Sequence, residues 1–206
     1  MTKTCDDLIE LFNNISDFAG MCIGNVEIRD ASGQWFNASG VRVDWSPLDL
    51  LARTVNLSET TVDELNVRRR PVRTPRPETT SEPWAVRLER GEISRLLIAE
   101  GVAGPASASS VSARFINERS GSIDALLEVK PLEGAGDEVI ARLLRERTSE
   151  FDLVIDGVAP ASGLFAHLLG LPETSSAKLA AKASGNLDDG RGEATLTIDN
   201  ADKVFL

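Results

Sequence analysis

The sequence is poor in the side chains that usually hold metals or attack substrates. Its 206 residues include two cysteines, one histidine and no tyrosine. Cys5 and Cys22 are too few for a disulfide scaffold and are not spaced like zinc ligands, so we interpret both as small apolar side chains. The one histidine, His167, lies in an apolar stretch without a cysteine or carboxylate cluster beside it, and we interpret it as a packed or half-exposed side chain.

Long apolar runs and leader signals are also missing. No stretch of about 18 apolar residues is present, so the sequence predicts no transmembrane segment. Asp6, Asp7 and Glu10 lie where a secretory signal would be basic and then apolar, so no signal peptide is expected. The net charge of -10 argues against nucleic acid as the main partner, because phosphate binding needs a basic face.

Catalytic motifs are absent as well. The sequence has no Gly-x-Ser-x-Gly elbow, no phosphate-binding P-loop, no Gly-x-Gly-x-x-Gly after a strand and no His-Glu-x-x-His. Its paired carboxylates, Asp6–Asp7 and Asp188–Asp189, lie at an expected helix start and in an expected turn, where aspartate is favoured for local reasons. We therefore predict a protein that is not an enzyme and that uses no metal or cofactor.

What the sequence does contain is apolar and polar residues in alternation, most clearly between residues 26 and 45. The runs Val26–Asp30 and Val41–Trp45 both have the period of two that is typical of a strand with one dry face. Ala31–Gly33 has the composition of a hairpin loop. Ser46 before Pro47 then predicts a short helix that caps the sheet.

The N-terminal region has a different period. Apolar residues recur at helical spacing between residues 4 and 19, which predicts one amphipathic helix. This helix would either pack on the end of the sheet or lie on a membrane or partner, although its acidic polar face disfavours an anionic bilayer. We therefore divide the chain into an amphipathic segment, 1–21, and a β segment, 22–206.

The rest of the chain predicts a series of short strands. Residues 137–147 fit either a helix or a strand, and we choose strand because both flanks look like hairpins. Residues 160–172 predict a short apolar helix ended by Gly170 and Pro172. A last hairpin is expected between Leu179 and Ile198. Roughly ten to twelve strands with two or three short helices make this an all-β protein, for which antiparallel pairing is the simplest topology.

One segment interrupts the alternation. Residues 68–77 contain five arginines and three prolines, so we place a loop or extended linker over 68–83 inside the β segment. It would serve either as a solvated connection or as a basic surface that grips phosphate head groups or an acidic partner.

A long sheet with one apolar face needs a cover for that face, and this chain has few helical residues to supply one. Either the sheet forms a closed β-sandwich, or it is a long curved antiparallel sheet that forms an open groove and binds something apolar such as an acyl chain. The closed form would make the chain a protein-interaction or scaffold module without lipid binding. The residues predicted to line a common interior are Val26, Ile28, Val41, Val43, Trp45, Val55, Leu57, Val86, Leu88, Leu127, Val129, Leu153, Ile155, Leu196 and Ile198.

The order and spacing of several segments resemble the amino-terminal region of the TamB family, the inner-membrane component of the translocation and assembly module of Gram-negative bacteria. The residues that carry this resemblance are Ile23–Trp35, Val41–Arg53, Arg70–Pro71, Ser162–Pro172 and Gly185–Gly192. The family begins with a transmembrane anchor and is several times longer. This chain has an acidic amphipathic stretch in place of the anchor, so we expect a fragment, a truncated reading frame or a short relative.

The resemblance implies an AsmA-like, bridge-like lipid-transfer protein whose β-sheet forms a hydrophobic groove (a β-taco). It implies a periplasmic location with an inner-membrane anchor, transport of phospholipid toward the outer membrane, and a role in outer-membrane protein assembly and secretion. The implied partners are phospholipid acyl chains, the remainder of the parent TamB-like chain and the Omp85-type outer-membrane barrel TamA. No catalytic residues come with the resemblance.

Overall fold

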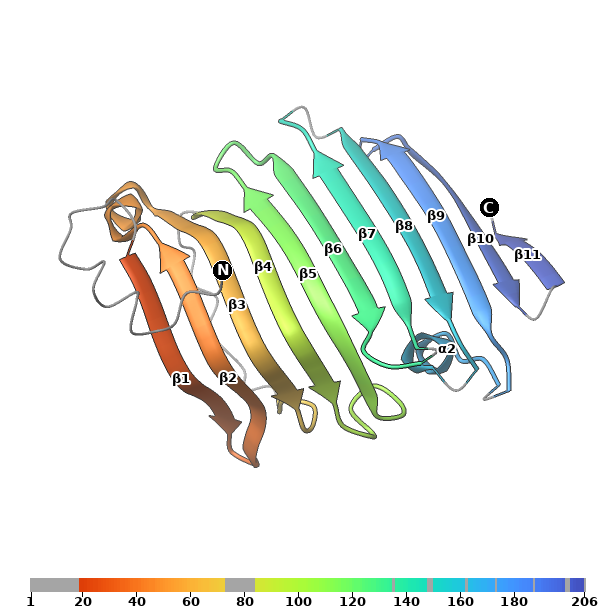
Figure 1. Ribbon diagram of the computed structural model, residues 1–206. Coiled ribbons are helices and arrows are strands. Elements are labelled where there is room, and N and C mark those ends of the chain that lie inside the picture. Colours follow the sequence, from red (N-terminus) through yellow and green to blue (C-terminus); the bar gives the residue numbers. More distant parts are fainter. Residues whose placement is uncertain are drawn as a thin grey trace.

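The computed structural model describes residues 19–72, 84–134, 136–147, 150–161, 163–172, 174–186, 188–198 and 201–205. These residues form one sheet of eleven strands whose spatial order follows the chain (Figure 1). The strands are β1 (Ala19–Asp30), β2 (Gly33–Trp45), β3 (Thr54–Val67), β4 (Ala85–Ile98), β5 (Ser107–Asn117), β6 (Ile123–Pro131), β7 (Glu138–Arg145), β8 (Phe151–Ala159), β9 (Ala177–Gly185), β10 (Gly190–Ile198) and β11 (Ala201–Phe205).

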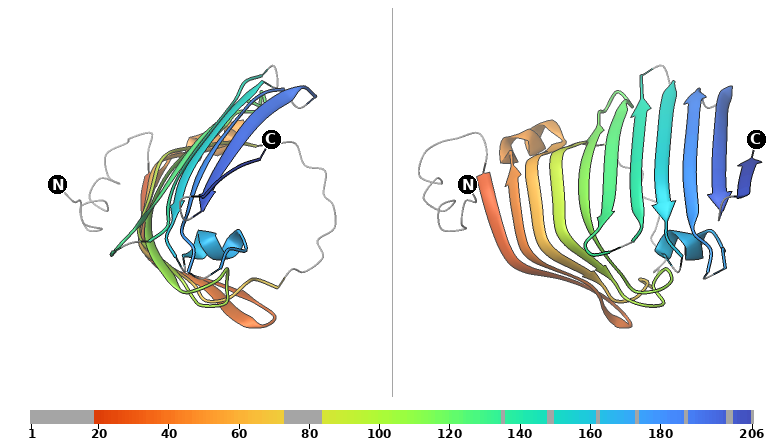
Figure 2. Two further views of the ribbon diagram at one scale, coloured as in Figure 1. Left: turned by 90° about the vertical axis from the view of Figure 1, so that its right-hand side faces the viewer. Right: turned by 45° about the vertical axis from the view of Figure 1, so that its right-hand side comes forward.

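The all-β prediction is confirmed, and the described sheet is a single curved layer that does not close on itself (Figure 2). At about 4.8 Å between neighbours, eleven strands make a sheet roughly 48 Å wide. The alternative of a closed β-sandwich is wrong for the described residues, because there is no second sheet to cover the first. The helices in the described part are η1 (Pro47–Ala52) and α2 (Leu164–Leu168).

Local sequence signals set the first hairpin and its capping helix. Residues 31 and 32 form the turn between β1 and β2, and Gly33 takes a φ of 102°, which only glycine adopts without strain. Ser46 then lies at the N-cap of η1, with Pro47 in its first turn, as the sequence predicts. The helix expected over residues 4–19 lies outside the described residues, except for Ala19, where β1 begins.

The weaker sequence predictions have mixed outcomes. Residues 137–147 are strand, as chosen, over β7, and the last hairpin pairs Leu179 with Leu196. The apolar helix expected over 160–172 is confirmed only for α2, after which Gly170 adopts a φ of 68°. Residues 55–57 and 62–67, which look like two short strands in the sequence, belong to the single strand β3.

The expectation of purely antiparallel pairing is wrong at one place. β3 and β4 are parallel neighbours, with Thr54 opposite Ala85 and Val67 opposite Ile98. Each of these strands spans roughly 45 Å, so the chain must return over that distance before β4 can begin. Residues 68–84, which include the Arg/Pro-rich segment, connect the two strands in the sequence. The sequence shows the length of this segment, but it does not show that the segment lies between two parallel neighbours.

The start of the return segment is fastened to the first hairpin. Arg69 donates hydrogen bonds to both carboxylate oxygens of Asp30 and, at 2.6 Å, to the carbonyl of Gly33. The backbone N–H of Val72 donates to the same carboxylate at 2.8 Å. Arg70 donates to the carbonyl of Val102. These two arginines therefore bind groups of the protein itself. Arg73 and Arg76 of the same segment lie outside the described residues, so its phosphate-gripping role stays a prediction.

The hydrogen bonds from Arg69 and from two backbone N–H groups hold the pKa of Asp30 well below its ordinary range. We expect Asp30→Asn to lower the thermal midpoint at pH 7. Because the folded-state pKa is depressed, the stability that Asp30 contributes is present above the ordinary aspartate pKa and is lost as the pH falls below it. The gap between wild type and variant should therefore close in acid, as followed by circular dichroism melts. Asp152→Asn, at an exposed outer position, is the control, and an equal pH dependence of both variants would contradict this role.

Candidate functional site

The two faces of the sheet can be told apart by the position of α2. Figure 2 shows this helix inside the curve of the sheet, near its lower end. Ala166 of α2 packs against Ala159 and Ala177, with Leu196 and Ile198 beside them. The face that carries these sheet residues is therefore the inner one, and we call it the concave face.

The pairing register extends the concave face from strand to strand, because directly paired residues in neighbouring strands point to the same side. Three rows run across the sheet, and each meets β8 and β9 on the side covered by α2. One contains Trp45, Leu57, Leu88, Phe115, Ala125, Leu143, Leu153 and Ala183; the next Met21, Val43, Thr60, Gly91, Ala113, Leu127, Ala141, Ile155, Ala181 and Ala194; the third Val62, Ile93, Val111, Val129, Val139, Gly157, Leu179 and Leu196.

The residues that the sequence predicts as a common lining all lie on this concave face. They belong to these rows or to rows next to them on the same strands. By register they are Val26, Ile28, Val41, Val43, Trp45, Val55, Leu57, Val86, Leu88, Leu127, Val129, Leu153, Ile155, Leu196 and Ile198.

Strict alternation alone would not keep them on one face. Each of the first four strands has a three-residue step, a place where consecutive inward-facing residues lie three positions apart instead of two, and these steps form a line across the sheet. The residues of β5 that pair with the step of β4, Val111 and Ser109, are only two positions apart, so the register between β4 and β5 shifts there. An extra residue of this kind bends a strand, as a β-bulge does, and β1 to β4 bend in Figure 2. Gly40 lies within the step of β2, with a φ of 62° and no room for a Cβ beside Asp63. The steps on this line are Ile23 to Val26, Val41 to Ala38, Val62 to Leu65, and Ile93 to Leu96. β3 and β4 make a second step, Leu57 to Thr60 and Leu88 to Gly91, where β2 and β5 advance by two residues.

The concave face is only partly covered. No large side chain among the described residues is fully buried, and Met21, Phe115 and Leu127 remain 42%, 38% and 39% exposed on this face. The chain thus leaves open an apolar surface that a closed fold would bury.

The opposite, outer face carries the ion pairs of the sheet, together with exposed apolar side chains such as Ile140, Leu144 and Val158. Glu59 pairs with Arg90, and Glu64 with Arg95, each at 3.4 Å across the parallel β3–β4 ladder. Arg114 pairs with Asp124 at 3.1 Å. Exposed ion pairs of this kind contribute at most about 1 kcal/mol each, so their main effect is to keep this face in water. Charged residues are therefore concentrated on the outer face, whereas exposed apolar residues occur on both faces of the layer.

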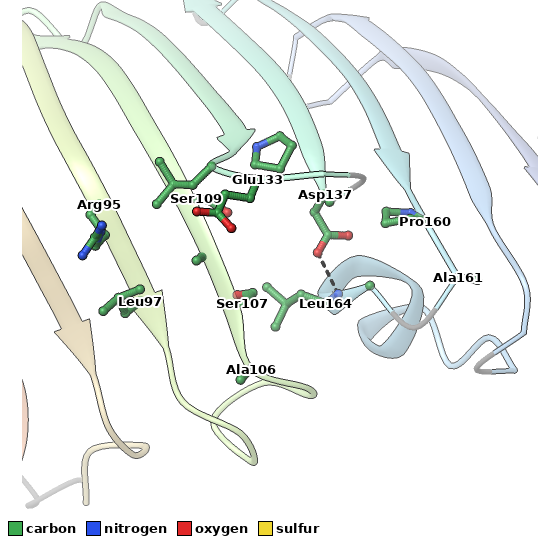
Figure 3. Close-up of a pocket in the computed structure, with 15 residues that line it drawn as sticks. Arg95, Leu97, Ala106, Ser107, Ser109, Glu133, Asp137, Pro160, Ala161 and Leu164 are labelled. Carbon is green, nitrogen blue, oxygen red and sulfur yellow. Dashed lines mark hydrogen bonds between the residues drawn. The ribbon is translucent and has the colours of Figure 1, made fainter.

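The lower end of the concave face is closed by α2, which a buried carboxylate holds in place. Asp137, only 7% exposed, accepts hydrogen bonds from the backbone N–H groups of Leu164 at 2.7 Å and Phe165 at 3.1 Å. It thus supplies from the β6–β7 loop the N-terminal cap that Gly163 cannot. Figure 3 shows Asp137 and Leu164 on the wall of a cavity of about 410 Å³ that also includes Ser107.

A second, smaller cavity lies beneath α2 on the concave face. It has a volume of about 140 Å³, and its walls are almost entirely apolar. Phe165, Leu168 and Leu169 line it from the helix side. The sheet side of this cavity includes the small residues Gly157, Ala159 and Ala177, which leave space above the backbone.

Sequence reasoning missed several features of this face. Leu65, Ile98 and Phe115 also point inward, and only the register across the three-residue steps assigns them to the same side as their neighbours. The capping role of Asp137 had no sequence signal, because its helix begins 27 residues later. His167 is exposed on α2, with its ring close to Gly104, and lines a cavity of about 480 Å³ together with Arg70 and Glu100.

Within the described residues, no group of histidine, cysteine and carboxylate side chains could hold a metal ion. None of the helices described is long and apolar enough to cross a membrane. Neither a protein-family model, nor a curated protein, nor a solved structure matches the chain. The resemblance to the TamB family therefore stays a prediction.

Proposed function

We propose that this chain carries lipid acyl chains on its concave face and has no catalytic role. The observation that carries the proposal is the open apolar surface, built from rows that cross the sheet from β1 to β10, whereas the ion pairs lie on the outer face. Monomeric proteins rarely expose apolar surface of this extent without a ligand or partner for it. An acyl chain suits a long strip of aliphatic side chains, since it offers no polar group to leave unpaired.

The energetics favour a long apolar ligand over a compact one. Each methylene that leaves water contributes about 0.8 kcal/mol before the costs of ordering the ligand are subtracted. The strip along β8 from Phe151 to Ala159 measures roughly 27 Å at ~3.4 Å per residue, so it can contact an entire fatty-acyl chain. No enclosed pocket is needed, because the contact accumulates along the strands.

The resemblance to the TamB family points to the same kind of ligand. On that basis we propose a segment of a periplasmic, inner-membrane-anchored protein that moves phospholipid toward the outer membrane and supports outer-membrane protein assembly together with an Omp85-type barrel. The apolar concave face supports the lipid part of this proposal. Location and partner rest on the resemblance alone.

The proposal is tested by lipid retention. Delipidated protein is mixed with vesicles of phosphatidylethanolamine and phosphatidylglycerol, re-isolated by size exclusion and analysed by mass spectrometry. We expect phospholipid to co-elute at a saturable ratio, because the exposed aliphatic rows can cover acyl chains. Protein that returns without lipid at every vesicle concentration would rule out the carrier function and leave a protein-interaction module as the better interpretation.

A further inference from the structure

Within β1 to β10, the rows of the concave face contain one charged residue, Arg145. It is the last residue of β7, at the end of the sheet opposite α2 (Figure 1). Its partners across the neighbouring strands are Ile123 and Phe151, both of which face inward. The row that it belongs to is Val55, Val86, Asn117, Ile123, Arg145, Phe151 and Gly185.

Arg145 keeps part of its hydrogen-bonding capacity unused. Its Nε and Nη2 atoms donate to the carbonyl of Gly121 at 2.9 and 2.6 Å, which holds the side chain against the β5–β6 loop. A guanidinium has five N–H donors, so three remain. In the described part of the chain, no carboxylate lies within ion-pair distance of Arg145, although arginines on the outer face have such partners.

A half-buried guanidinium without a counter-ion on an apolar surface is a favourable place for an anion. Its planar fork suits a carboxylate or a phosphate, to which arginine donates two parallel hydrogen bonds. Its contact with Gly121 restricts the side chain before any ligand arrives, so less conformational entropy is lost on binding.

The surface between Arg145 and α2 has the dimensions of an acyl chain. Along β7 the inward positions after Arg145 are Leu143, Ala141 and Val139. The strand covers ~20 Å between Arg145 and Val139 at ~3.4 Å per residue. That is about the length of a common fatty-acyl chain. At its far end lies the apolar cavity beneath α2, which Phe165 helps to line.

We propose that Arg145 binds the anionic head group, a carboxylate or phosphate, of an amphiphile whose acyl chain runs along β7 to β9 with its methyl end toward α2. This inference rests on the proposed carrier function and adds to it a polarity: head group at the β7–β8 turn, tail at the helix. Neighbouring strands contribute only apolar and small side chains between these two ends, among them Leu153, Ala181 and Ala183.

The test compares amphiphiles that share a palmitoyl chain and differ in charge. Each ligand displaces the neutral reporter N-phenyl-1-naphthylamine from the full chain. We expect palmitate and palmitoyl-lysophosphatidate to bind at least tenfold more tightly than neutral monopalmitoylglycerol. In Arg145→Gln this preference should disappear while the affinity for monopalmitoylglycerol stays unchanged. Arg142→Gln is the matched control, because Arg142 lies on the same strand but on the outer, exposed face.

The outcomes separate this inference from the proposed function. If neutral and anionic ligands bind wild type equally, or Arg145→Gln keeps the preference, the head-group role of Arg145 is wrong and the carrier function stands. If no amphiphile displaces the reporter, the carrier function itself fails and this inference with it. Displacement by millimolar inorganic phosphate alone would assign the site to free phosphate instead. Should Arg145→Gln not fold, Arg145→Lys keeps the charge without the fork and should retain only part of the preference.

Discussion

Replacing Ile155 by glutamate is expected to reduce phospholipid retention by at least tenfold. Ile155 lies on the concave face between its register partners Ala141 and Ala181, so a carboxylate there would have no hydrogen-bond donor or counter-ion beside it in its row. An acyl chain that covers this position would have to desolvate the charge, and that costs more than the contact returns. The measurement is the lipid-to-protein ratio after re-isolation from vesicles.

Val154→Glu is the matched control for this experiment. Val154 is the preceding residue on β8 and points to the outer face, where its register partners are Arg142 and Lys182. A glutamate placed between two cationic side chains is well accommodated. We expect lipid retention and thermal midpoint to stay near wild type. An equal loss of lipid in both variants would show that the effect is on the fold, and retention in both would contradict a ligand on the concave face.

Replacing Asp137 by alanine should destabilise the α2 end of the sheet by about 1–3 kcal/mol, the usual cost of leaving buried donors without a partner. Both of its carboxylate oxygens accept backbone N–H groups, from Leu164 and Phe165, in a largely buried position. Without them α2 should separate from Ala159 and Ala177, because five helical residues cannot maintain a helix in water on their own. Hydrogen exchange of the α2 amides measures this directly.

Asp137→Asn is the informative companion variant. It keeps one acceptor oxygen at the same position, so it should retain part of the protection of Leu164 and Phe165. The remainder of the sheet should keep its exchange pattern in both variants, since α2 touches only its lower end. Unchanged protection of α2 in the alanine variant would contradict the capping role of Asp137.

The alternation of the sequence determined most of the fold. Within each alternating run, the period of two shows which residues share a face, and this does not depend on distant parts of the chain. The turn at Gly33, the helix start at Pro47 and the helix stop at Gly170 were equally local, since each depends on one residue's backbone freedom or its loss. Alternation therefore groups the predicted lining residues within each run, and the three-residue steps bring the runs of β1 to β4 onto one side of the sheet.

Other features required the tertiary structure, because they depend on residues far apart in the chain. The parallel pairing of β3 with β4 follows from where residues 68–84 return, and no local pattern specifies that. The three-residue steps join the alternating runs of β3 into one face only through its pairing with the neighbouring strands.

The sequence by itself determined which side chains are apolar together, and the tertiary structure decided what they do there. Alternation is a short-range property, so it marks a dry face without saying whether another layer covers it. Long-range pairing decides whether the face closes, which carboxylate caps α2 and which arginine lies among apolar neighbours. In this protein that pairing leaves one layer open, with Arg145 at one end of its apolar face and α2 at the other.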